Sequence, residues 1–199
     1  MEMTLISNLG RILGSLFYSA PSSKQNLPLL SFFKLGDWQA DCVFLSGETT
    51  QQIQEYFSEF ELEQLEEEYQ RLFIGPHALA VAPWGSVYLD KEEVIFGDSL
   101  LAMRTFLQEN GIEFTSDNHE PEDHFGLMLM LSAYLAEQYP DKLAFFWGEH
   151  FLTWGYRFLT LLQAQPKSFY VGLAILTEQF LLHYHRQLSV VVAEVQLYR

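Results

Sequence analysis

The stretch Glu120-Pro121-Glu122-Asp123-His124-Phe125-Gly126, with the apolar run 127–135 behind it, decides the fold class of this chain. A proline and acidic residues ahead of an apolar run are typical of a helix N-terminus, where the helix dipole favours negative charge. We therefore expect a helix to begin near Pro121. Its sequence is apolar nearly all round, which predicts a helix buried at the centre of the molecule.

The segments on both sides of this helix also carry helical spacing. Leu5, Leu9 and Leu13 predict a first helix, in which Gly10 and Gly14 permit close packing of a neighbour. Further helices are expected at 27–35, 51–60, 61–73, 98–109, 141–147, 149–163 and 167–185. Only the tail, 188–195, has a strand-like β-branched run, and no second run could pair with it. The sequence predicts an all-α bundle of roughly ten helices, with residues 1–199 forming a single globular domain.

Composition excludes several classes of protein. The formal charge is -15 with only 11 basic residues, which argues against nucleic acid and favours a basic partner. Much of the negative charge lies in 55–68, which also fits a solvated helix face. Cys42 is the only cysteine, so the chain has no intramolecular disulfide, and no apolar stretch reaches the length of a membrane span. A cytoplasmic protein is expected, because the N-terminal run is a poor signal peptide.

Enzyme and metal motifs are missing from the sequence. It has no nucleophile elbow, phosphate-binding loop, dinucleotide fingerprint or zinc-protease motif. Asp123 and His124 are adjacent, so on a helix their side chains point about 100° apart and cannot form a dyad. His119 and His124 straddle the expected helix start, which is poor geometry for a metal ion. We therefore expect no catalytic residues, no metal site and no cofactor.

A peptide-binding site suits the same residue types better. A carboxylate near a helix start can accept two hydrogen bonds from an arginine, and aromatic side chains offer flat apolar surface. Trp84, Tyr88, Phe96 and Phe125 are the candidates for that surface, with core packing as the alternative for each. The combination matches a ligand that is cationic at one end and apolar along its length.

Three further segments make the expectation specific. They are Tyr69-Gln70-Arg71-Leu72-Phe73-Ile74-Gly75-Pro76, Ala82-Pro83-Trp84-Gly85-Ser86-Val87-Tyr88 and Phe96-Gly97-Asp98-Ser99. Taken with 120–126, they resemble the TorD/DmsD/NarJ family of chaperones, most closely its DmsD branch. The likeness covers most of the chain, from the segment 13–18 near the start to the aromatic-rich C-terminal third, and is dense only from 69 to 126. It implies a TorD-like helical fold and binding of the twin-arginine signal peptide of a molybdenum reductase, here the catalytic subunit of a dimethyl sulfoxide reductase. Export would be delayed until the reductase is folded and its cofactor inserted.

The resemblance also implies which residues recognise the peptide. They are Tyr69, Leu72, Phe73, Gly75, Pro76, Pro83, Trp84, Tyr88, Glu120, Pro121, Asp123 and His124. Departures from the DmsD branch occur at His77 and Tyr88, where tryptophan is common, and they leave the client open. Four other possibilities also stay open: a NarJ-like nitrate reductase assembly factor, weak binding of guanine nucleotide, contact with the Tat translocase, and a dimer that exchanges helices. A hydrolase that uses Asp123 and His124 from separate surfaces is the rival from the enzyme class.

Overall fold

The computed structural model describes residues 2–76, 79–92, 95–113 and 120–199 of the chain. His77 and His119 lie outside these ranges. The described residues form the helices α1 (Glu2–Tyr18), α2 (Asn26–Leu35), α3 (Gly47–Ser58), α4 (Leu62–Tyr69), α5 (Ser86–Leu89), α6 (Asp98–Glu109), α7 (Phe125–Gln138), α8 (Pro140–Phe146), α9 (Leu152–Gln163) and α10 (Phe169–Gln187). Three single turns complete them: the 3-10 turn η1 (Asp37–Asp41) and the π-helical turns η2 (Gln70–Ile74) and η3 (Trp147–Phe151). No strand occurs within these ranges, and the predicted all-α fold is confirmed.

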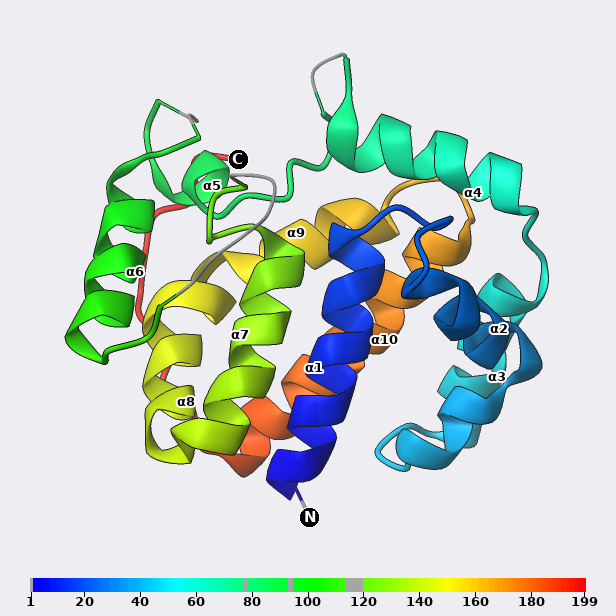
Figure 1. Ribbon diagram of the computed structural model, residues 1–199, viewed down its shortest axis with the longest axis horizontal. Helices are drawn as coiled ribbons and strands as arrows, with labels where there is room; N and C mark the ends of the chain where they lie inside the picture. Colours follow the sequence, from blue (N-terminus) through cyan, green and yellow to red (C-terminus); the bar gives the residue numbers. More distant parts are fainter. Residues whose placement is uncertain (1, 77–78, 93–94, 114–119) are drawn as a thin grey trace.

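Helices α1 and α7 lie side by side at the centre of the molecule (Figure 1). Helix α10 packs on α9 and α3, α2 packs on α3, and α8 packs on the C-terminal part of α7. The apolar residues of α7 are buried on several faces, among them Leu127, Met128, Leu129 and Leu131. The sequence pattern had predicted this central position.

Glycines allow the backbones of α1 and α7 to approach closely. A Cβ atom added to Gly14 would lie 2.6 Å from the carbonyl oxygen of Gly126, and one added to Gly126 would lie 2.6 Å from that of Gly14. A Cβ on Gly10 would lie 2.8 Å from the carbonyl oxygen of Leu129. The close packing predicted for Gly10 and Gly14 is confirmed, and the partner of Gly14 is the glycine that ends the 120–126 motif.

The start of α7 differs from the prediction. The helix begins at Phe125 with His124 as its N-cap, and Pro121 precedes it instead of opening it. Residues 121–124 form a turn in which the His124 amide donates to the Pro121 carbonyl at 3.1 Å. Helix α3 also starts earlier than expected, since the Ser46 hydroxyl caps it by accepting from the Thr49 amide.

The C-terminal tail forms neither a helix nor a strand. Its Ala193 amide donates to the Gly148 carbonyl at 3.0 Å, and its Tyr198 amide donates to the Tyr88 carbonyl at 2.9 Å. The tail thus runs along η3 and brings the C-terminus next to α5 (Figure 1). These isolated backbone contacts do not form a ladder, so the β-branched run does not become a strand.

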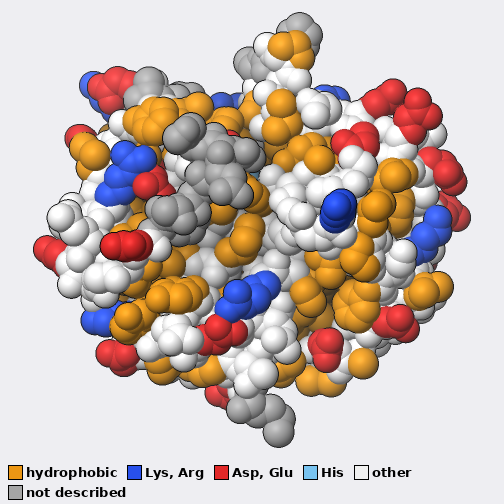
Figure 2. All heavy atoms as spheres, in the orientation of Figure 1, with side chains coloured by type: hydrophobic (Ala, Val, Ile, Leu, Met, Phe, Trp, Pro, Cys, Tyr) orange, Lys and Arg blue, Asp and Glu red, His pale blue; other side chains and the backbone are white. Residues whose placement is uncertain are grey.

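The polar face of α4 carries much of the acidic surface. Leu65 and Tyr69 are buried, whereas Glu63 and Glu67 are exposed. Figure 2 shows acidic side chains gathered over this helix, at the upper right of the view. A solvated helix face therefore accounts for part of the net charge. In the described part of the chain, no helix combines the length and the apolar character needed to cross a membrane.

Candidate functional site

Two segments that lie far apart in the sequence are joined by backbone hydrogen bonds at the start of α7. The Phe125 amide donates to the Pro83 carbonyl at 2.7 Å, and the Gly85 amide donates to the Asp123 carbonyl at 3.1 Å. The side chain of Asp123 adds a third link, because its Oδ2 accepts from the Ser86 amide at 2.7 Å. The 82–88 and 120–126 motifs therefore form one structural unit.

Asp123 is buried at the centre of this unit, with 4% of its surface exposed. Burial raises the pKa of its carboxyl group, while the Ser86 amide and the nearby Ser86 side chain act in the opposite direction. Its second oxygen, Oδ1, is buried without a hydrogen-bond partner. One oxygen thus holds the 83–86 segment in place, and the other is left to accept a further hydrogen bond.

His124 is a buried, uncharged cap. Its Nδ1 accepts from the Gly126 amide at 3.1 Å, which requires that nitrogen to carry no proton. Complete burial lowers the pKa of the imidazole to about 3. The ring forms T-shaped pairs with Tyr18 and Trp84, at centroid distances of 5.4 and 6.3 Å. His124 thus satisfies one of the free amides at the start of α7.

Trp84 and Glu120 form the accessible rim of the unit. Both side chains are partly exposed, and the Trp84 indole nitrogen donates to Glu120 Oε1 at 2.5 Å. An aromatic surface with a carboxylate at its edge is suited to a ligand that is both apolar and cationic.

The 69–76 motif reaches the same region through the end of α1. The Tyr69 hydroxyl donates to the Tyr18 carbonyl at 2.6 Å. The ring of Phe17 touches both Phe73 and Phe125, at centroid distances of 6.2 and 5.0 Å. Gly75 has a φ of 99°, a conformation that favours glycine. Phe17 and Tyr18 were not predicted as site residues, although they belong to an N-terminal segment that shares the family likeness.

Most of the predicted site residues are buried, and a minority face solvent. Gly75, Pro76, Trp84 and Glu120 have exposed or partly exposed surface. The buried members are Tyr69, Leu72, Phe73, Pro83, Tyr88, Pro121, Asp123 and His124. Tyr88 donates its hydroxyl to the Ala82 carbonyl at 2.8 Å and stacks on Trp154. The buried residues shape this surface from below, and their direct contact with a peptide stays a prediction.

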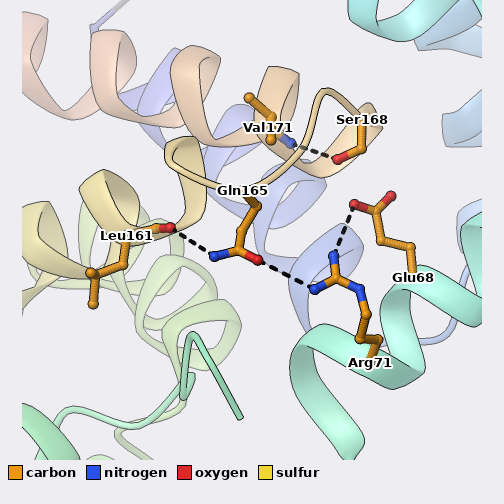
Figure 3. A network of polar contacts seen from close by, with 6 residues as sticks. All are labelled: Glu68, Arg71, Leu161, Gln165, Ser168 and Val171. Atoms are coloured by element: carbon orange, nitrogen blue, oxygen red, sulfur yellow. Dashed lines mark hydrogen bonds and ion pairs between the residues drawn. The ribbon is translucent and has the colours of Figure 1, made fainter.

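A cleft of about 450 Å³ lies away from this surface, between α4 and the connection from α9 to α10. Arg71 on its wall donates to Gln165 at 3.3 Å and pairs with Glu68 at 3.9 Å (Figure 3). Gln165 in turn donates to the Leu161 carbonyl, and the Ser168 hydroxyl caps α10. Lys167 also lines the cleft, so side chains of both charges lie there. None of the predicted peptide-binding residues lines this cleft. Within the described ranges, no group of three potential metal-ligating side chains is found anywhere.

Comparison with known proteins identifies the family. The sequence profile described as nitrate reductase delta subunit matches residues 45–160. The probable Tat proofreading chaperone DmsD of Haemophilus influenzae is 45% identical over 100% of both chains. The chain belongs to the nitrate reductase delta subunit family. This is the TorD/DmsD/NarJ family that the motifs resemble, so the prediction of the family is confirmed.

Further proteins with related names are also similar to this chain. The Tat proofreading chaperone DmsD of Salmonella typhi is 41% identical over 95% of this chain and 93% of its own. The chaperone protein TorD of Ferrimonas balearica is 29% identical over 59% of this chain and 56% of its own. The crystal structure of a proposed redox enzyme maturation protein from Archaeoglobus fulgidus superposes with a TM-score of 0.57 at 20% identity, over 91% of this chain and 93% of that one. This last likeness supports the helical fold.

Proposed function

We propose that this protein is a non-catalytic chaperone that binds the twin-arginine leader of a molybdenum reductase. The observation that carries the proposal is the 45% identity, along the whole chain, with a Tat proofreading chaperone. In its finer form, the client is the catalytic subunit of a dimethyl sulfoxide reductase, and the chaperone delays its export until folding and cofactor insertion are complete. It would act in the cytoplasm, where the leader is made.

The surface near the start of α7 supports this function. Trp84 provides aromatic surface next to the carboxylate of Glu120, and the chain as a whole carries a charge of -15. A leader with two arginines and an apolar run is complementary to both properties. The acidic surface would attract the basic end over several ångströms, and apolar contacts would hold the complex once formed.

We expect the apolar run of the leader to provide more of the affinity than the geometry of its arginines. An exposed ion pair contributes roughly 0.2–1 kcal/mol, whereas full burial of a leucine-sized side chain contributes about 1.5–3 kcal/mol. Serine substitutions in the run should therefore weaken binding more than a change of both arginines to lysine, which keeps the charge. Calorimetric titration with the leader of a dimethyl sulfoxide reductase and these two variants gives the ranking.

The reverse ranking would show that the arginines are bound in a desolvated pocket and would rule out an apolar surface as the main source of affinity. Trp84→Ala should weaken binding of the unmodified leader, and Phe145→Ala, which removes an exposed aromatic side chain on α8, serves as the matched control. A guanine nucleotide turnover assay on the same preparation tests the nucleotide alternative. Turnover without any leader binding would overturn the proposed function.

A further inference from the structure

An open cavity of about 510 Å³ lies next to Asp123, between α5, α6, η3 and the C-terminal tail. Its volume is within the range of small-ligand sites, about 300–1,000 Å³. Leu89, Met103 and Trp154 give it an apolar wall, and Tyr198 of the tail lines it as well. The cavity shares Asp123 with the candidate site and was not anticipated from the sequence.

The charges that line the cavity are all negative. Its described lining includes no lysine or arginine, and its carboxylates are Asp90, Asp98, Asp123 and Glu149. His150 also lines it, but burial lowers the pKa of its imidazole to about 4, so this ring carries no charge at neutral pH. A cavity whose charged groups all carry one sign attracts a ligand group of the opposite sign.

The arginine that interacts with Asp123 is already paired with another carboxylate. Arg104 of α6 interacts electrostatically with Asp123, but its Nε donates to both carboxylate oxygens of Glu122 at 3.0 and 2.9 Å. Its Nη2 lies 2.7 Å from Glu122 Oε2. Arg104 therefore satisfies Glu122 outside the cavity instead of filling the cavity itself.

The buried carboxylate of Asp123 provides an independent indication of a ligand. Its Oδ1 has no hydrogen-bond partner, although the residue is only 4% exposed. The Ser86 hydroxyl lies near it but outside hydrogen-bond geometry. A buried acceptor without a donor destabilises the protein, and a charged one does so more strongly, so a donor from outside the chain would be stabilised at this oxygen.

We propose that this cavity receives an arginine side chain of the bound leader. A guanidinium group presents several N–H donors in a planar fork, which suits a cavity lined by several carboxylates, and its aliphatic stem suits the apolar wall. The inference rests on the proposed function, since the leader supplies the arginine. It adds the place of binding and gives a role to Asp98 and Glu149, neither of which was among the predicted peptide-binding residues.

A double-mutant cycle tests the proposal. The protein variant is Asp98→Asn with Glu149→Gln, two exposed carboxylates whose change leaves the Asp123 hydrogen bond intact. The peptide variant is the dimethyl sulfoxide reductase leader with both arginines replaced by glutamine. Against the unchanged protein, this replacement should weaken binding by about tenfold, the size of one charge-assisted hydrogen bond. Against the protein variant, the same replacement should weaken binding by less than about threefold.

The matched control is Glu48→Gln with Glu63→Gln, which removes the same charge from the first turns of α3 and α4. The control should keep the full tenfold loss. Equal losses of affinity in the cavity variant and the control would mean that the arginines respond only to the overall charge of the protein. This result would overturn the inference, whereas leader binding itself would still support the proposed function. Absence of leader binding by the unchanged protein would instead reject the proposed function. Tight binding of arginine amide alone, without coupling to the leader, would assign the cavity to a free small molecule and also overturn the inference.

Discussion

Gly126→Ala should lower the free energy of unfolding by about 3 kcal/mol, in the upper part of the range for overpacked cores. The added methyl group would lie 2.6 Å from the carbonyl oxygen of Gly14 and 2.9 Å from the Cβ of Tyr18. Neither neighbour is the end of a flexible side chain, so α1 and α7 must move apart. Urea denaturation followed by circular dichroism measures the loss.

Gly47→Ala is the matched control for this variant. Gly47 is the first residue of α3, and a Cβ atom added there meets nothing within 4 Å. Alanine should leave the stability unchanged or raise it by up to about 1 kcal/mol, because it favours helix more than glycine does. If Gly126→Ala behaved like this control, the crossing would not depend on glycine, and our account of the motif's last residue would be wrong.

The second large effect is expected on acidification. The pKa of His124 falls from 6.5 to about 3 on folding, so the unfolded chain binds more protons between these values. The stability due to the neutral ring is therefore complete above about pH 6.5 and is lost as the pH falls towards 3. At pH 5, His124 alone should lower the free energy of unfolding by about 2 kcal/mol relative to its value above about pH 6.5, since one pH unit corresponds to 1.36 kcal/mol.

The variant His124→Asn isolates this contribution. Asparagine can still accept a hydrogen bond at the N-cap but does not titrate, so the difference in unfolding free energy between variant and parent should shrink as the pH falls from about 7.5 to 5. Urea titrations at several pH values provide the measurement. Asp123 opposes the trend, because its raised pKa makes folding more favourable as its carboxyl group is protonated. A parent and a variant with parallel pH profiles would show that the buried imidazole does not control acid stability.

The helices were predictable because their signals are local. The spacing of Leu5, Leu9 and Leu13 is sufficient to define α1, and the apolar run of α7 is sufficient to place it at the centre. The family was predictable for a similar reason, since its motifs are short and appear in a fixed order.

The roles of the motif residues were not predictable, because their partners come from elsewhere in the chain. Asp123 and His124 were predicted to bind the leader, which stays a prediction, and the structure adds hydrogen-bond partners within the protein for both of them. The amide that binds Asp123 belongs to Ser86, and no periodicity in the sequence indicates that pairing. The acidic cavity was missed for the same reason, because α6, η3 and the tail meet only in the folded chain.

The crossing of α1 and α7 also has a consequence for the order in which this protein can fold. The two helices are separated by more than a hundred residues, from Tyr18 to Phe125. At synthesis rates of about 5–20 residues per second, α1 leaves the ribosome roughly 5–20 s before its partner. During that interval the face of α1 that carries Gly10, Gly14 and Phe17 has no α7 to cover it. A nascent chain that stops before residue 125 would therefore present an uncovered apolar helix at its N-terminus, and it is the synthesis of α7 that ends this exposure.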